Sequence, residues 1–479
     1  MTYLVNSLYI LAFGLFILGL SGLTGPKTAV RGNLIAATGM GLAVIATLIK
    51  VRDTASVNWI LIVAGLVIGV ILGVPPAKKT KMTAMPQLVA LFNGVGGGTV
   101  ALIAWSEFIE TDGFSRFRAE QSPTVALVVV SLFAAIIGSV SFWGSLVAFL
   151  KLQESIPKNV EKRLVKSAKL FQASNVVLLI GAVGAAVYIG LHAIPGEGSP
   201  GWLIVLVLLL AGVMGLFVVF PIGGADMPVV ISLLNAMTGL SAAAAGLALN
   251  NTAMIVAGMI VGASGSILTN LMAVAMNRSI PAIVFGSFGA GAEGAAAVGG
   301  DQGTAKATSA ADAAIQMAYA NQVIVVPGYG LAVAQAQHAV KDMASILESK
   351  GVEVKYAIHP VAGRMPGHMN VLLAEADVEY DAMKEMDDIN GEFSRTDVTL
   401  VIGANDVTNP AARNDPSSPI HGMPILNVDQ SRSVIVLKRS MSSGYAGIEN
   451  PLFFLGHTSM LFGDAKKSVG EVTEELKSL

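Results

Sequence analysis

The chain has 479 residues, of which 53% are hydrophobic and 13% are charged, and its mean hydropathy is +0.67. Soluble domains carry charge on about a quarter of their residues, so this composition excludes a purely water-soluble protein. The net charge of −2 gives no indication of nucleic-acid binding, and the absence of cysteine excludes disulfides and thiolate metal sites. Charges are sparse before Ser279 and evenly spread after Asp301, so we expect two domains.

The first half of the chain contains about nine apolar runs that are long enough to span a bilayer as helices. They cover approximately 4–23, 33–50, 58–75, 86–106, 124–150, 170–191, 202–220, 227–249 and 252–275. The chain enters the first run without a basic region or a cleavage site, so we interpret this run as a membrane helix and not as a signal peptide. We predict a polytopic α-helical membrane domain over residues 1–278.

Basic residues between the predicted spans concentrate in alternate loops, which places these loops on the cytoplasmic side. With nine spans, the C-terminus lies on the same side as these loops. We therefore predict a multi-pass membrane protein whose C-terminal domain lies in the cytoplasm or the equivalent matrix space. The basic residues of these loops are Lys27, Arg31, Lys78, Lys79, Lys81, Lys151, Lys158, Lys162, Arg163 and Lys166.

A few polar side chains lie within or next to the apolar runs, where they are costly and often functional. Asn93, Ser145 and Asn235 are candidates to line a hydrated path, and Asp226 lies at the entrance of the eighth run. A packing role for the small polar residues stays open, and Asp226 before Met227-Pro228 also suits a helix N-cap. No Asp, Glu, Lys, Arg or His lies in the middle of a predicted span.

Residues 279–320 are rich in Gly, Ala and Ser, which is typical of a connector. We expect a linker here, either flexible or a simple spacer, before a soluble domain over 321–479. In that domain, predicted strands at 323–326, 353–358, 398–403, 424–428 and 433–438 alternate with helices that end near 349 and cover 368–376. The alternation predicts a doubly wound, Rossmann-like parallel sheet, which binds ligands at the carboxyl ends of its strands.

The first of these strands is followed by a glycine-rich turn. Gly328 and Gly330 would let the backbone approach a dinucleotide pyrophosphate closely. Val333 replaces the third glycine of the usual fingerprint, so a glycine turn without a ligand stays open. Three further strand-end loops, at 359–368, 403–410 and 444–447, suit either ligand contact or plain turns. Their candidate ligand residues are Gly363, Arg364, Met365, Pro366, Gly403, Asn405, Asp406, Val407, Gly444, Tyr445, Ala446 and Gly447.

The choice between NAD and NADP depends on whether cations are present for the 2′-phosphate. The second strand contains both Glu353 and Lys355 and decides nothing. The triplet at 438–440, Lys-Arg-Ser, follows an apolar strand and suits a dianionic phosphate. A solvated strand end is the alternative for this triplet. No metal-ligand set is evident.

Together these segments resemble the beta subunit of the proton-translocating NAD(P)+ transhydrogenase. The resemblance covers nearly the whole chain. It is carried by residues 327–335, 359–370, 403–412, 438–441 and 444–453, and in the membrane half by 85–90, 223–228 and Asn235. It implies a subunit that couples Si/Re-specific hydride transfer between NAD(H) and NADP(H) to proton translocation. This chain would bind NADP(H), and an alpha subunit would carry the NAD(H) domain and the remaining membrane helices, in a dimer of the whole assembly.

The resemblance also implies roles for particular residues. Asp406 corresponds to an acid near the nicotinamide that is implicated in coupling, and the loop 444–447 covers the nucleotide. The residues expected to contact the pyrophosphate region are Gly328, Tyr329, Gly330, Ala332 and Val333, and those expected to hold the 2′-phosphate are Lys438, Arg439 and Ser440.

In one position the chain departs from the family pattern. Many members carry a histidine, the proposed proton carrier, where this chain has Asn93. We therefore expect a three-chain enzyme in which a histidine of the alpha subunit titrates beside Asn93, Ser145 and Asn235. The main alternative function is an ion channel or secondary transporter with a nucleotide-sensing domain, but that function does not account for the cationic triplet.

Overall fold

The computed structural model describes residues 2–81, 84–115, 124–157, 160, 163–164, 167–192, 198–223, 226–285, 304–365, 367–444 and 446–479. The chain forms two compact units. One comprises Met1–Pro221 and Val230–Thr269, and the other comprises Ile222–Val229 and Asn270–Leu479.

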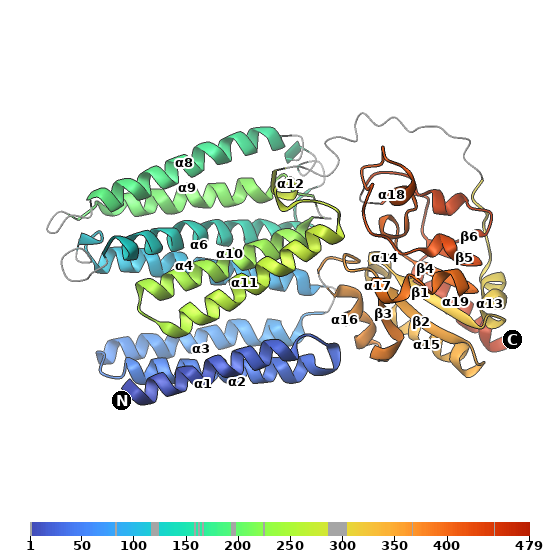
Figure 1. Cartoon of the computed structure of the whole chain (residues 1–479), viewed down its shortest axis with the longest axis horizontal. Helices are drawn as coiled ribbons and strands as arrows, with labels where there is room; N and C mark the ends of the chain where they lie inside the picture. The colour runs from blue at the N-terminus through green and yellow to red at the C-terminus, as the bar shows by residue number, and fades with distance from the viewer. Residues whose placement is uncertain are drawn as a thin grey trace. The chain divides into compact units, whose positions relative to one another are not determined.

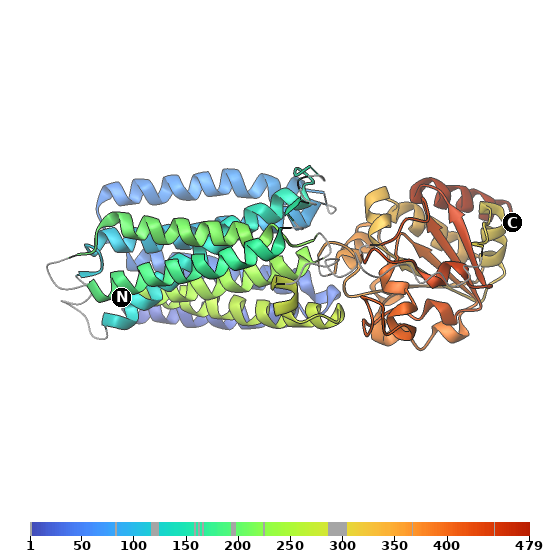
Figure 2. The same cartoon turned by 90° about the horizontal axis from the view of Figure 1, so that it is seen from above.

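Among the described residues, nine helices are long and apolar enough to cross a membrane. Figures 1 and 2 show them lying side by side. They confirm the nine predicted spans. The helices are α1 (Thr2–Gly22), α2 (Pro26–Lys50), α3 (Ser56–Lys79), α4 (Met85–Glu110), α6 (Thr124–Leu152), α8 (Ala168–His192), α9 (Gly201–Val219), α10 (Met227–Ala248) and α11 (Thr252–Ala275).

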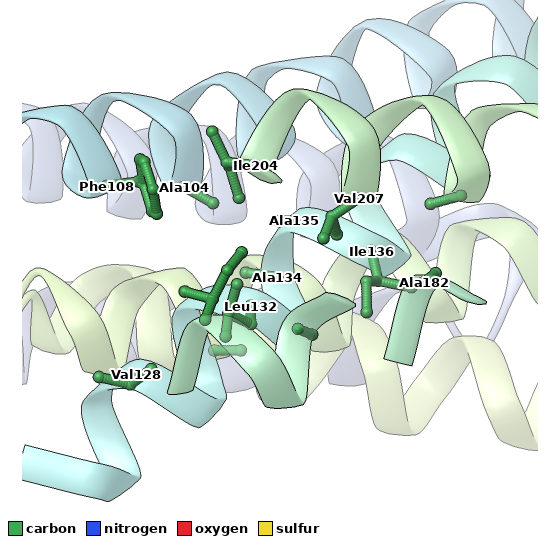
Figure 3. Close-up of a cluster of buried hydrophobic side chains, with 14 of the residues drawn as sticks. Ala104, Phe108, Val128, Leu132, Ala134, Ala135, Ile136, Ala182, Ile204 and Val207 are labelled. Atoms are coloured by element: carbon green, nitrogen blue, oxygen red, sulfur yellow. The ribbon is translucent and has the colours of Figure 1, made fainter. Parts of the chain in front are cut away.

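The centre of the bundle is formed by small and aliphatic side chains of α4, α6, α8 and α9, part of which Figure 3 shows. Lipid offers no hydrophobic driving force for helix association, so membrane helices depend on close packing. Small residues permit this packing because they let the backbones approach closely. A Cβ on Gly97 of α4 would lie 2.9 Å from the carbonyl oxygen of Gly138 on α6. The backbones of α4 and α6 therefore touch at this point, next to the polar residues discussed below.

The second unit contains a six-stranded sheet with the strand order β3-β2-β1-β4-β5-β6. All pairs of neighbouring strands are parallel. This is the doubly wound order, in which the chain leaves β1 toward one edge and returns to the other side of β1 at β4. The strands are β1 (Gln322–Pro327), β2 (Glu353–Ile358), β3 (Met383–Glu385), β4 (Val398–Ile402), β5 (Ser433–Lys438) and β6 (Thr458–Phe462).

Both faces of the sheet are covered, so its strands are continuous apolar runs. Alternate residues of β1 face opposite sides because side chains alternate along a strand. Ile324 and Val326 belong to a core cluster that also contains Met386, Ile389 and Phe393. In Figure 1 three helices, α13 (Ala310–Ala318), α15 (Gln337–Ser349) and α19 (Ala465–Ser478), lie together beside the sheet.

The prediction of a strand at 424–428 is wrong, and β3 and β6 were not predicted. The segment is apolar and its Leu426 is fully buried, which explains the error. Its backbone pairs with loops and not with a strand: Leu426 N–H donates to the Val407 carbonyl, and the Asn390 amide bonds both Ile425 and Asn427. Burial of an extended segment thus does not require a place in the sheet.

Shorter elements complete the unit. They are α12 (Ile280–Phe285), α14 (Tyr329–Ala334), α16 (His368–Glu375), α17 (Met386–Ile389) and α18 (Ala411–Asn414), with 3-10 turns at Tyr380–Ala382, Phe393–Arg395, Asp406–Thr408, Val428–Gln430 and Pro451–Phe454.

The range predicted as a linker, 279–320, contains α12 and α13. Thr308 N–H donates to the carbonyl of Met460 on β6 at 2.9 Å, so the chain already runs along the sheet edge there. Residues 286–303 lie outside the described part of the chain. The linker limits therefore remain a prediction.

Candidate functional site

Two glycine turns meet at the carboxyl edge of the sheet, where the strand order reverses between β1 and β4. Gly328 N–H donates to the Ile402 carbonyl at 2.8 Å, and Gly330 N–H donates to the Gly403 carbonyl at 3.0 Å. A Cβ on Gly328 would collide with the backbone of Gly403, which itself has a φ of +66°. Only glycine permits this approach. The turns after β1 and β4 are therefore in direct backbone contact at the switch point, where a doubly wound sheet binds its ligand.

A cavity of about 220 Å³ opens beside these turns. Its walls are mainly backbone and apolar side chains, with the Asp406 carboxylate and Asn405 as polar groups. This is the usual character of a ligand pocket. Nine of the predicted ligand residues line it: Gly328, Tyr329, Gly330, Gly363, Gly403, Asn405, Asp406, Val407 and Gly444. Val361, Ala362, Ile420 and Met423, which were not predicted, also line it.

The helix after the first turn is short. α14 ends at Ala334, and the next residue, Gln335, has a left-handed φ of +50° before α15 begins. Ala332 is buried in this helix, whereas Val333 is 49% exposed. The Arg364 guanidinium lies over the ring of Tyr329 at 4.5 Å from its centre, a cation–π contact. The loop after β2 therefore reaches the turn after β1.

The Asp406 carboxylate joins the loop after β4 to the loop after β5. Its Oδ2 accepts a hydrogen bond from Ala446 N–H at 3.0 Å. A Cβ on Gly444 would collide with the same carboxylate. Gly447 N–H bonds the Gly444 carbonyl at 3.2 Å, which closes a turn in the second loop. The predicted cover loop is therefore held against Asp406.

Two buried asparagines that sequence reasoning missed strengthen this connection. The Asn409 amide donates to the Glu449 carbonyl, and the Asn450 amide donates to the Asn405 carbonyl, both at 3.1 Å. Each asparagine also accepts a bond from a backbone N–H two residues further on. Each precedes a proline in the sequence, and this dipeptide marks turns that could have drawn attention to both.

The cationic triplet follows directly from β5. Lys438 Nζ donates to the Ser442 carbonyl at 2.7 Å and lies over the ring of Phe453. Burial lowers the pKa of Lys438, and the nearby Asp406 opposes this shift. The Ser440 hydroxyl bonds the Ser442 hydroxyl at 2.7 Å. Arg439 is exposed and makes no ion pair with any residue that the structure describes.

A second cavity, of about 350 Å³, lies next to the segment 441–443 that follows the triplet, and Asn405 lines both cavities. The predicted ligand loops therefore border two adjacent spaces along one edge of the sheet. Met365 lies between Arg364 and α16, and its carbonyl accepts a bond from His368 N–H. Pro366 and Tyr445, both predicted to contact the ligand, lie outside the described residues.

In the membrane unit, the structure brings together two of the predicted polar residues. Asn93, 8% exposed, donates through Nδ2 to Ser145 Oγ at 2.9 Å and to Ser141 Oγ at 3.3 Å. The Ser141 hydroxyl in turn bonds the Thr238 hydroxyl, so α4, α6 and α10 are joined. Ser141 was missed, although it lies one helical turn before Ser145 and so shares its face.

The other two polar candidates lie elsewhere. Asn235 is exposed on α10 and is not part of this cluster. Asp226 is buried and forms an ion pair with Arg278, whose Nη1 lies 2.7 Å from Oδ2. Arg278 also donates to the Ala282 carbonyl, so Asp226 connects the start of α10 to the segment after α11.

The described part of the chain combines nine apolar helices with a doubly wound domain whose glycine turns border a cavity at the switch point. These features define a membrane-bound nucleotide-binding protein. Residues 5–475 match the family model of the NAD(P) transhydrogenase beta subunit. Two subunit beta sequences of Rhodospirillum rubrum, one from strain ATCC 11170, are 46% identical over 475 residues, covering 99% of this chain and 99% of each relative. The chain belongs to the NAD(P) transhydrogenase beta subunit family, as the resemblance indicated, and the channel or transporter alternative is not favoured.

Proposed function

We propose that this chain is the NADP(H)-binding and proton-conducting subunit of a membrane transhydrogenase. Hydride passes with Si/Re specificity between NAD(H) on an alpha subunit and NADP(H) on this chain, and the transfer is coupled to proton movement. The observation that carries the proposal is the switch-point cavity with Asp406 in its wall and the cations of 438–439 one strand away.

The residues present fit a dinucleotide with an additional phosphate. Gly328 and Gly330 line the cavity without side chains, so a diphosphate could approach the backbone there closely. Lys438, Arg439 and Ser440 offer two cations and a hydroxyl to a 2′-phosphate. When bound, the nicotinamide supplies hydride exchange. Around it, the apolar wall excludes water, and Asp406 holds the covering loop through Ala446 N–H.

The membrane unit supports the proton-coupling part of the proposal. Asn93, Ser141, Ser145 and Thr238 form a hydrogen-bonded cluster of three helices, and none of these side chains titrates near neutral pH. The cluster itself therefore cannot carry the proton, and we propose that a histidine of the alpha subunit does. Asn235, exposed on an apolar helix, fits contact with such a partner, because an amide facing lipid is costly.

The assembly follows from these assignments. We propose a three-chain enzyme, present as a dimer of the whole assembly in the bacterial inner membrane, with the nucleotide domain in the cytoplasm. One charge crossing the membrane gains roughly 2.3 kcal/mol per 100 mV. That amount shifts a balanced hydride exchange about 50-fold, which is sufficient to bias it toward one nucleotide.

The test is nucleotide binding by the complex of this chain with its alpha subunit. Lys438→Ala/Arg439→Ala should weaken NADPH binding by at least about 100-fold, because it removes two charge-assisted bonds that contribute about 1.5–3 kcal/mol each. Calorimetry with NADPH measures this effect. Lys466→Ala/Lys467→Ala removes the same charge from exposed positions of α19 and should leave the affinity unchanged.

The assignment of NADP(H) to this chain fails under either of two outcomes. In the first, the double variant at 438 and 439 binds NADPH as tightly as the unmodified complex. In the second, both double variants weaken binding equally, which would mean that overall charge and not a phosphate site determines the affinity.

A further inference from the structure

His368 is a buried residue at the end of the predicted loop 359–368, and it was not among the candidate ligand residues of that loop. It is the first residue of α16, follows Gly367 with its φ of +67°, and is 0% exposed. Its imidazole ring packs on the backbone of Gly363, where a Cβ would lie 2.5 Å from Nδ1. The ring therefore occupies the place that a side chain at 363 would need, directly behind the loop that lines the cavity.

The ring accepts a hydrogen bond from the loop. Arg364 N–H donates to His368 Nδ1 at 2.9 Å. A ring nitrogen that accepts a bond carries no proton, so the neutral ring is protonated at Nε2. Burial and the charge of Arg364 lower the pKa of His368 to about 4, so the ring remains neutral and remains an acceptor at neutral pH.

This bond also influences where the Arg364 guanidinium lies relative to Tyr329 in the turn after β1. With its backbone fixed by His368, Arg364 places its guanidinium over the ring of Tyr329, 4.5 Å from the centre. The rings of Tyr329 and His368 are 6.3 Å apart. His368 Nε2 has no hydrogen-bond partner among the described residues, so the Nδ1 bond and packing determine the orientation of the ring.

We propose that His368 is a positioning residue of the dinucleotide site. Its neutral Nδ1 holds the 363–364 backbone so that Arg364 and Tyr329 together form one wall of the site where the loops after β1 and β2 meet. His368 itself acts through these two residues and does not contact the nucleotide. The inference rests on the proposed NADP(H) site and adds the residue that sets its shape.

The test compares two substitutions in the complex of this chain with its alpha subunit. His368→Asn retains an acceptor oxygen where Nδ1 lies, whereas His368→Leu has a similar apolar bulk and no acceptor. We expect His368→Leu to raise the Kd for NADPH about tenfold, since it removes the acceptor of the Arg364 N–H bond that holds the loop. We expect His368→Asn to stay within about threefold of the unmodified complex. The KM for the NAD(H) substrate should not change in either variant.

Two results would overturn the inference: NADPH binding by His368→Leu that equals the unmodified complex, or binding by His368→Asn that is as weak as by His368→Leu. Where His368→Leu does not fold, histidine-selective ¹⁵N spectroscopy of the unmodified complex decides. An unprotonated Nδ1 with a protonated Nε2 supports the inference, and a protonated Nδ1 contradicts it. Failure of the proposed function is distinguishable, because the unmodified complex itself would then show no preference for NADPH over NADH.

Discussion

The nucleotide site and the membrane cluster differ in the kind of polar group that they contain. At the sheet edge, glycines line the cavity, and the chain supplies its own charges through Asp406 and the cations of 438–439. In the bundle, Asn93 Nδ2 donates neutral hydrogen bonds to the hydroxyls of Ser141 and Ser145, and its Oδ1 has no partner among the described residues. The first site has the charged groups that ligand binding needs, whereas the second can orient a proton carrier but cannot be one.

This difference explains why the two units are expected to respond differently to mutation. In the nucleotide domain, close backbone contacts leave no room for adjustment, because folded interiors are densely packed and the two turns touch directly. In the membrane cluster, each neutral bond contributes about 1 kcal/mol, and a neighbouring hydroxyl can replace a lost partner. A single change should therefore be more damaging at the sheet edge than in the bundle.

The largest effect is expected from Gly328→Ala. The added Cβ would collide with the Gly403 carbonyl and push the two turns apart, so we expect a loss of NADPH affinity of about 100-fold or more. Calorimetry on the complex with the alpha subunit measures it. Gly391→Ala is the matched control in the same domain, because a Cβ at 391 meets no atom within 4 Å.

The expected greater sensitivity of the sheet edge would be contradicted if Gly328→Ala bound NADPH as well as Gly391→Ala does. That result would mean that the turns can move apart without loss, and that the tight backbone contact between β1 and β4 is not what shapes the site.

Features of these two regions were predictable from the sequence where they depend on patterns among neighbouring residues. The membrane helices, the parallel sheet and the turn at Gly328 were predictable because apolar length, alternation and glycine spacing are local patterns. The segment 424–428 was mistaken for a strand because apolar composition reports burial and not hydrogen-bond partners.

Contacts between distant loops were not predictable in this way. Asn409 and Asn450 each bond a backbone about 40 residues away, and nothing in the sequence pairs these positions. The orientation of Asn235 away from Asn93 is a property of helix packing, which polarity along a single span does not reveal. Residue types therefore indicated which chemistry the chain can perform, and the structure was needed to group the residues.

A smaller effect is expected in the membrane cluster. Asn93→Leu removes the donor to Ser145, and we expect about tenfold slower proton-coupled turnover, with NADPH affinity unchanged. Thr99→Val on the same helix is the control, because among the described residues its hydroxyl bonds just the Val95 carbonyl of its own helix. Proton uptake by vesicles containing the complex, measured per hydride transferred, distinguishes the two. Unchanged pumping in Asn93→Leu would remove the cluster from the proton path.

The smallest effect is the response of the nucleotide domain to mild acid. Burial lowers the pKa of His359 and of His368 to about 4 from an ordinary value near 6.5. The unfolded chain therefore binds more protons than the folded domain between about pH 6.5 and pH 4. Stability is full above this window and falls as the pH drops through it. Each histidine should cost roughly 0.7 kcal/mol between pH 7 and pH 6, and up to about 1.4 kcal/mol for each further pH unit.

None of the four side chains of the membrane cluster titrates near neutral pH, so the cluster itself should not respond to mild acid. Hydrogen exchange of residues 321–479, corrected for the intrinsic pH dependence of exchange, measures local stability in the intact complex. His368→Asn should remove about half of the slope, because His359 keeps the other half. His457→Gln, at an exposed position, should leave the slope unchanged. An equal slope in all three proteins would show that these buried rings do not resist protonation, and that the neutral acceptor at 368 depends on something other than burial.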